Sequence, residues 1–397
     1  MNASEDLQRR IVQSGLLSQD ELESLAAASL TATNNSDQAL LEFLVAERRL
    51  TDFQAAALAA GFTGPFMLGP YRVHERIAAG RLGDLFRAVH VEFDQPVSLK
   101  VFSSALARDP EQFARMQREV RVAVQLDHPQ VVRSFQIGRI GDVHFLAFED
   151  LHGETLEARL ARSGKLPYPE ACRLLRQAAL GLESLHEAEI AHLDLRPANL
   201  WINEHDQLKI VEFGTARDAL SFLDQLDQAD QLPGYDPVLG DSRYLAPEAA
   251  ADADAADPRS DIYSLGCSLY HVLAGQPPFG YLDSERQRQA HADEPPRSLT
   301  WHVPDLPQPL AEIVARALAK LPDDRPTIAE LDFALERYVD DRQTSLAPTE
   351  TWSPEFLAWV QEANLLAGGA SPSSSGLNDE MAEFLDWLAT SRSPPSD

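Results

Sequence analysis

Lys100 lies inside an apolar segment, so a fold that buries this segment must place an anionic group beside the lysine. Residues 95–103 have the β-branched and aromatic composition of a strand. Burying an ammonium group there costs free energy unless something anionic meets it. Glu119, on a predicted helix after the strand, is a candidate partner for the lysine.

A glycine turn precedes this lysine. Two predicted strands, at residues 71–79 and 84–91, enclose a turn that contains Gly80 and Gly83. Glycines in such a turn let backbone N–H groups approach phosphate oxygens without a clash from a Cβ atom. Many strand-turn-strand hairpins carry two glycines, so the turn by itself indicates phosphate binding only weakly.

The pattern after Lys100 changes from strands to helices. A helix with an apolar face fits residues 113–124, and two further strands fit residues 131–138 and 142–148. From about residue 154 to 339 the pattern is mostly helical. The sequence therefore predicts a small β-rich lobe followed by a larger helical lobe.

Short motifs of mixed charged and apolar residues interrupt the helical part. They are His192-Leu193-Asp194-Leu195-Arg196-Pro197-Ala198-Asn199-Leu200, Ile210-Val211-Glu212-Phe213-Gly214, Ala246-Pro247-Glu248, Ser260-Asp261-Ile262-Tyr263-Ser264-Leu265-Gly266 and Asp324-Arg325-Pro326. Asp194 and Asn199 are separated by five positions.

In this order, the motifs between Tyr71 and Val339 resemble those of a eukaryotic-like Ser/Thr protein kinase, a family found also in bacteria. The shared elements are the glycine loop, the strand lysine, the helix glutamate, the H-x-D-L-x-x-x-N loop, the x-F-G segment and A-P-E. The resemblance implies an α+β, two-lobed protein kinase fold with a small β-rich lobe and a large helical lobe. It covers about two thirds of the chain.

The resemblance also implies the reaction and the residues that serve it. The γ-phosphoryl group of ATP would pass to a protein hydroxyl with Mg²⁺ or Mn²⁺, which requires mainly positioning and charge neutralisation. The implied catalytic residues are Asp194, Lys100, Glu119 and Arg196. The implied nucleotide-binding residues are Ile77, Gly80, Gly83, Leu85, Lys100, Glu149, Leu151 and Asn199. The implied metal ligands are Asn199 and Glu212, and Glu248 and Arg325 would form a buried structural ion pair.

Three positions weaken the match to the family. Glu212 replaces the metal-binding aspartate, and its extra methylene group displaces the carboxylate from the geometry that magnesium requires. Ala78 replaces a glycine, and Leu193 replaces the arginine that reads a phosphate on the activation loop. The loop between Glu212 and Glu248 is acidic, so we expect no phosphorylation switch in it.

Two further replacements affect the catalytic loop itself. Arg196 replaces a lysine, which keeps the charge but changes the shape of the side chain. Asp241 replaces a threonine that contacts the catalytic aspartate in the family. Because Asp241 would repel Asp194, we expect Arg196 to bridge the two carboxylates.

The chain is predicted to have three parts: a helical module at residues 1–65, a kinase-like domain at 71–339 and an acidic C-terminal tail at 340–397. Capping boxes at Ser18 and Thr51 support helices in the first part. The module is either a plain helical bundle or a docking site for a partner. Short amphipathic stretches in the tail, one beginning at Ser353, either pack back on the body or bind a partner.

Composition restricts the partners and the compartment. The net charge of −28 argues against nucleic acid and anionic membrane surfaces and is compatible with a basic protein substrate. Two cysteines without a C-x-x-C motif suit a reducing compartment. Because no signal peptide or long apolar run is evident, we expect a cytoplasmic protein.

Two functions from different classes remain open at this point. The first is an active Ser/Thr protein kinase, supported by Lys100, Glu119, Asp194 and Asn199. The second is a pseudokinase that acts as a signalling scaffold, supported by the replacements described above. A small-molecule kinase fits less well, because the Ala-Pro-Glu and late arginine motifs build a platform for protein substrates in the family.

Overall fold

The computed structural model describes residues 3–29, 36–64, 66–78, 83–102, 124, 126–140, 143–211, 235–236, 240–251, 255–339 and 352–366. The chain divides into two compact units. The first unit contains Met1–Arg108, Phe135–Asp150 and Thr351–Asp397, and the second contains Asp109–Ser134 and Leu151–Glu350.

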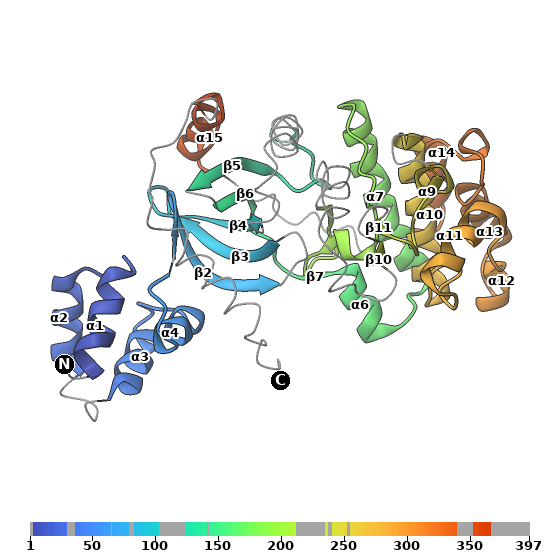
Figure 1. Ribbon diagram of the computed structural model, residues 1–397. Coiled ribbons are helices and arrows are strands. Elements are labelled where there is room, and N and C mark those ends of the chain that lie inside the picture. Colours follow the sequence, from blue (N-terminus) through green and yellow to red (C-terminus); the bar gives the residue numbers. More distant parts are fainter. Residues whose placement is uncertain are drawn as a thin grey trace. The chain divides into compact units, whose positions relative to one another are not determined.

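The first unit is built on a six-stranded sheet in the order β1-β2-β3-β4-β6-β5 (Figure 1). Its strands are β1 (Met67–Leu68), β2 (Tyr71–Ala78), β3 (Gly83–His90), β4 (Gln95–Phe102), β5 (Ser134–Ile140) and β6 (Val143–Glu149). Strand β4 pairs antiparallel with both β3 and β6, and its last six residues are buried. This central position explains why its sequence is nearly continuous in apolar residues.

The expected strand at residues 131–138 begins three residues later, at Ser134. In the second unit, Val131 forms a parallel bridge with Ile210, and the Val132 N–H donates to the Ile210 carbonyl at 2.9 Å. These two valines therefore satisfy their backbone groups on a different strand. The expected helix at residues 113–124 lies largely outside the described residues.

Four short helices precede the sheet in the first unit. They are α1 (Ala3–Gln13), α2 (Gln19–Ser29), α3 (Asp37–Ala46) and α4 (Asp52–Ala59). Both predicted capping boxes are present: Ser18 with Glu21 before α2, and Thr51 with Gln54 before α4. Gln54 Nε2 also donates to the Val73 carbonyl of β2 at 2.6 Å. The helices are thus fixed to the edge region of the sheet.

The C-terminal helix α15 (Pro354–Leu366) packs on the same sheet, beside β5 in Figure 1. Its N-terminus is capped by Ser353, whose Oγ accepts from the Phe356 N–H at 3.1 Å. Phe356 is fully buried, with its ring 5.0 Å from that of Phe135. The cluster around it contains Tyr71, His90, Phe93, Phe135, Phe145, Trp352, Phe356 and Trp359. This part of the tail packs back on the sheet of the first unit. A second amphipathic stretch of the tail, at residues 381–388, lies outside the described residues.

We expect Phe356→Leu to lower the free energy of unfolding by about 1–2 kcal/mol, because it leaves space in the core and removes the aromatic contacts. The matched control is Phe333→Leu on α14 (Ile328–Glu336), where the side chain is 59% exposed. Urea unfolding of both variants is the measurement. Equal midpoints for the two variants would mean that α15 contributes nothing to the stability of the sheet.

The second unit is mainly helical. Its elements are β7 (Glu154–Thr155), α6 (Leu156–Ser163), α7 (Tyr168–Glu187), η2 (Pro197–Asn199), β8 (Leu200–Ile202), β9 (Leu208–Ile210), β10 (Tyr235–Asp236), β11 (Gly240–Asp241), α9 (Pro247–Ala251), α10 (Pro258–Ala274), α11 (Ser284–Asp293), α12 (Leu299–His302), α13 (Gln308–Ala317), η4 (Pro322–Asp324) and α14. Helix α10 is the core element, because it is buried from Ser260 to Tyr270 and packs on α7 and α13. No helix in the described part of the chain is long and apolar enough to cross a membrane.

Candidate active site

Asp194 and Asn199 are brought together by the loop that enters η2. Asn199 Nδ2 donates to the backbone carbonyl of Asp194 at 2.7 Å and to its carboxylate Oδ2 at 3.1 Å. The amide group therefore orients the carboxylate and the loop that carries it. The spacing of five residues allows the Asn199 side chain to reach back to both the carbonyl and the carboxylate of Asp194.

Asp261 of α10 anchors the start of this loop. Its side chain is fully buried, and it accepts hydrogen bonds from the backbone N–H groups of His192 at 2.8 Å and Leu193 at 2.7 Å. His186 Nε2 lies 2.8 Å from the same carboxylate. Leu193 has a φ of 62°, which is unusual for a residue with a Cβ atom, and the hydrogen bond to Asp261 holds it there.

The ring of His192 fixes the other side of the loop. Its Nε2 lies 2.9 Å from the Val211 carbonyl, and its Nδ1 lies 3.3 Å from the Asp194 backbone N–H. Because a carbonyl only accepts, Nε2 carries the proton and Nδ1 is the acceptor. The histidine thus ties the loop of Asp194 to the residue immediately before Glu212.

Arg196 lies between two carboxylates, as the sequence predicted. Its Nε is 3.3 Å from Asp194 Oδ2, and its Nη1 is 3.9 Å from Asp241 Oδ2. Arg243 also binds Asp241, with Nε 2.8 Å from Oδ1 and Nη2 2.5 Å from Oδ2. Hydrogen bonding to Asp241 raises the pKa of Arg243 well above its ordinary value. The buried charge of Asp241 is therefore balanced by two guanidinium groups, and that of Arg196 also contacts Asp194.

Glu248 and Arg325 form the expected buried ion pair. Two parallel contacts join them, Nη1 to Oε1 at 2.6 Å and Nη2 to Oε2 at 2.7 Å. Ser260 Oγ donates to the same glutamate at 2.6 Å. Burial acts to raise the pKa of Glu248, but the hydrogen bonds from Arg325 and Ser260 outweigh it and lower the pKa below its usual value.

The first unit carries Lys100 in the middle of its sheet. Leu85 on β3 and Leu146 on β6 are its partners across the two ladders. The Lys100 side chain is buried, and the direct pairing places Leu85 beside it on one face of the sheet. Ile77 lies on the neighbouring strand β2, and Gly83 is the first residue of β3.

The chain leaves β6 through Glu149 and Asp150, both of which are buried. Asp150 accepts from Arg87 Nε at 3.1 Å and from Ser98 Oγ at 3.3 Å. These bonds fix the position of the residue that follows Glu149. Leu151, the next residue predicted to bind nucleotide, is buried in the second unit.

Several predicted site residues cannot be placed. Gly80, Glu119 and Glu212 lie outside the described residues. Within the described ranges, no group of three or more His, Cys, Asp or Glu side chains is arranged to hold a metal ion. Ile77, Gly83, Lys100 and Glu149 belong to the first unit. Leu151, Asp194 and Asn199 belong to the second unit.

Sequence reasoning assigned no role to Asp150, to Arg243 as a partner of Asp241, or to Asp261 as the loop anchor. Asp150 could have been noticed as a carboxylate directly after an apolar strand. Arg243 is only two positions from Asp241, close enough for a local pair. Asp261 had no local signal, because its backbone partners lie 68 and 69 positions away.

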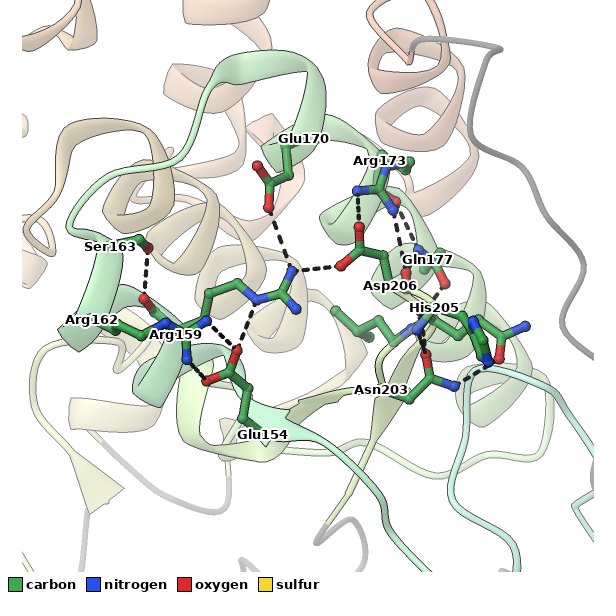
Figure 2. Close-up of polar contacts among 12 residues, drawn as sticks. Glu154, Arg159, Arg162, Ser163, Glu170, Arg173, Gln177, Asn203, His205 and Asp206 are labelled. Carbon is green, nitrogen blue, oxygen red and sulfur yellow. Dashed lines mark hydrogen bonds and ion pairs between the residues drawn. The ribbon is translucent and has the colours of Figure 1, made fainter. Parts of the chain in front are cut away.

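The hairpin of β8 and β9 is held by a network of ion pairs, shown in Figure 2. Asp206, in the turn of the hairpin, accepts from Arg159 Nη1 and Arg173 Nη2, each at 2.7 Å. Arg159 also reaches Glu154 of β7 at 3.2 Å. This hairpin begins directly after Asn199, so the network fixes the strands that flank the candidate active site.

Replacing Asp206 with asparagine removes the charge and keeps the volume. We expect the free energy of unfolding to fall by about 1–3 kcal/mol at neutral pH, because two charge-assisted hydrogen bonds are lost. The backbone tolerates the change, because asparagine adopts the φ of 55° that Asp206 has. The exposed Glu204→Gln in the same turn is the control, and urea unfolding is the measurement.

The same comparison should depend on pH. Burial acts to raise the pKa of Asp206, but hydrogen bonds from Arg159 and Arg173 outweigh it, so the pKa is lowered in the folded state. The extra stability is therefore complete above the unfolded value near 3.9 and is lost as the pH falls through the folded value. The gap between wild type and Asp206→Asn should stay constant from pH 7 to about 5 and close in more acid solution. A gap that widens in acid would contradict this assignment.

Comparisons with known proteins connect this geometry to a family. The model of the family "Protein kinase domain" matches residues 71–333. The serine/threonine-protein kinase PknB of Mycobacterium leprae is 30% identical over 313 residues, which are 78% of this chain and 48% of that protein. The serine/threonine-protein kinase PknE of Mycobacterium bovis is 33% identical over 258 residues, 65% of this chain and 44% of that protein. The chain thus spans about half the length of these curated relatives.

A solved structure gives the same result for the fold. The crystal structure of the Mycobacterium tuberculosis PknI kinase domain is similar with a TM-score of 0.54 and 27% sequence identity. The match covers 69% of this chain and 98% of that kinase domain.

Proposed function

Since this chain belongs to the protein kinase family, of the Ser/Thr type found in bacteria, we propose that it transfers the γ-phosphoryl group of ATP to hydroxyl groups of protein substrates. Its fold is the two-lobed α+β fold of that family. The observation that carries the proposal is the contact between Asp194 and Asn199 on a loop anchored by Asp261. This arrangement holds a carboxylate and an amide oxygen in fixed positions before any ligand binds.

In this proposal Asp194 accepts the hydrogen bond of the substrate hydroxyl and directs its oxygen toward the phosphorus atom. Asn199 uses its amide nitrogen on Asp194, which leaves its amide oxygen, a hard ligand of the kind that Mg²⁺ or Mn²⁺ prefers, for a divalent cation. Glu212 is proposed as the second metal ligand, and Lys100 as the contact of the α- and β-phosphates. When bound, ATP and the cation supply an activated γ-phosphoryl group.

The substrate is proposed to be a Ser or Thr residue of a basic protein. The Ser/Thr preference follows the relatives, which are named serine/threonine-protein kinases. The basic character follows the net charge of −28, which attracts cationic partners and raises their association rate.

The test is labelled phosphate transfer from ATP to a basic acceptor protein, with Mg²⁺ and separately with Mn²⁺. Wild type is compared with Asp194→Ala. Transfer that depends on Asp194 supports the kinase function. No transfer above the level of the variant with either metal would overturn it and would favour a scaffold.

A scaffold function has one specific observation in its favour. Arg196 is in contact with Asp194 and close to Asp241, so part of its charge is engaged by protein carboxylates. In the family the corresponding basic side chain faces the transferred phosphate. A chain in which this group stays with Asp241 would bind partners through its terminal segments and transfer phosphate slowly.

Asp241→Asn separates these possibilities further. The change keeps the size of the side chain and removes the charge that attracts Arg196 and Arg243. We expect the rate of phosphate transfer to rise about fivefold. This corresponds to an activation barrier that is lower by roughly 1 kcal/mol, because Arg196 no longer pairs with Asp241 and can contact the transferred phosphate. Single-turnover kinetics with saturating ATP measure it. An unchanged rate would show that Asp241 does not restrain Arg196.

A further inference from the structure

A hollow of about 450 Å³ opens in the first unit at the junction of the N-terminal helices and the sheet. Its walls come from the end of α1, the turns before α2 and after α3, and strand β2. Three arginines, Arg48, Arg49 and Arg72, line it together with a single carboxylate, Glu21. This concentration of positive charge is unusual in a chain with a net charge of −28.

The three arginines form no close ion pair, although the charges of Arg49 and Arg72 act on Glu21. Across the part of the chain that the structure describes, no carboxylate lies within 4.0 Å of any of these guanidinium groups. The Nε of Arg72 is buried and has no hydrogen-bond partner, which costs about 1–3 kcal/mol while it is unmet.

Glu21 does not neutralise this group. Its Oε2 accepts hydrogen bonds from Ser18, from the backbone N–H at 2.9 Å and from Oγ at 2.7 Å. These bonds lower the pKa of Glu21, and the charges of Arg49 and Arg72 lower it further, but its hydrogen bonds go to the helix cap. The hollow therefore keeps two positive charges in excess, and guanidinium groups bind carboxylates in a bidentate manner.

The rest of the wall is uncharged and includes Gly15 and Ser18. Val12, Leu16 and Leu17 line the same hollow, and the two leucines are nearly fully buried. Because the two leucines already pack inside the unit, a ligand meets mainly the charged and polar side chains of this wall. A ligand that carries several carboxylates along a short chain, as an acidic peptide does, can pair with more than one of the three guanidinium groups.

We propose that this hollow binds the acidic segment 378–388 of the chain's own tail. The segment carries Asp379, Glu380, Glu383 and Asp386, has no basic residue, and includes Met381, Phe384, Leu385 and Leu388. It follows α15, which packs in the same unit as the hollow, through a glycine- and serine-rich linker at 367–376. The twelve residues from 367 to 378 reach up to about 40 Å when extended, which spans a compact unit of this size.

The test is hydrogen exchange of the full-length protein, read at the amides of residues 378–388 and 15–21. In wild type these amides should exchange at least tenfold more slowly than in Arg48→Glu/Arg49→Glu. Combining that variant with Glu380→Arg/Glu383→Arg restores opposite charges and should restore the protection. About 0.5 M salt should weaken the protection in wild type, because it screens exposed charges.

The control is Arg286→Glu/Arg337→Glu, which changes the net charge equally at exposed positions of the second unit. It should leave the exchange of both segments as in wild type. Equal exchange of residues 378–388 in wild type and in the arginine variant would overturn the proposal. Protection that disappears on dilution would also overturn it, because the occupant would then come from a second molecule.

Discussion

Phosphate transfer should fall about a thousandfold when Asp194 is replaced by alanine. The variant loses the carboxylate that aligns the substrate hydroxyl, and general-base and positioning roles of this kind contribute between about 10² and 10⁴ in rate. A thousandfold loss corresponds to about 4 kcal/mol of transition-state stabilisation. The loss should occur mainly in kcat, because Asp194 acts on the reacting hydroxyl.

Asp194→Asn is the matched variant. It keeps the volume, and its amide oxygen can still accept from Asn199 Nδ2, which lies 3.1 Å from Oδ2 in wild type. We expect nearly the same loss of rate with no loss of stability. The melting temperature with and without ATP and metal measures whether nucleotide binding survives, since a ligand at 100 times its Kd stabilises the folded state by about 2.7 kcal/mol. Retained transfer in Asp194→Asn would show that the negative charge of Asp194 is not needed for phosphate transfer.

Arg325→Met should lower the free energy of unfolding by about 3–5 kcal/mol. The Arg325 side chain is fully buried, and that of Glu248 is 15% exposed, so the variant leaves a largely buried carboxylate without its cation. Carbonyl oxygens of Ala319 and Arg259 also lose their donor. Circular dichroism during urea unfolding measures the change, with the exposed Arg316→Met as the control.

The double variant Glu248→Met/Arg325→Met tests the cause of this penalty. It should be more stable than Arg325→Met, because no charge is then left buried alone. The penalty of Arg325→Met should also shrink in acid. The pKa of Glu248 is lowered in the folded wild type, so the pair contributes fully above the unfolded value near 4.3 and less as the pH falls below it. A double variant less stable than the single one would show that packing, not charge, sets the cost.

The parts of this molecule that depend on neighbouring residues could be predicted from the sequence. The strand around Lys100 and the capping boxes at Ser18 and Thr51 rest on local composition or short spacing. The position of Arg196 between two carboxylates also followed from charge, because Asp241 needed a counterion near Asp194.

The features that were missed depend on contacts between distant segments. The strand at β5 starts late because Val131 and Val132 pair with Ile210, nearly eighty positions away. Asp261 holds the loop of Asp194 from helix α10, which lies more than sixty positions further along the chain. Such contacts have no periodic signal, so they are found only when the chain is folded.

The burial of Phe356 against β5 has a consequence for how the protein is made. The sheet is complete in the nascent chain at Glu149, but the helix that covers its aromatic face follows about two hundred residues later. At roughly 5–20 residues per second, the ribosome needs about 10–40 seconds to add them. During that interval no α15 covers these aromatic side chains, so we expect the newly made sheet to expose an apolar face until the tail has been synthesised.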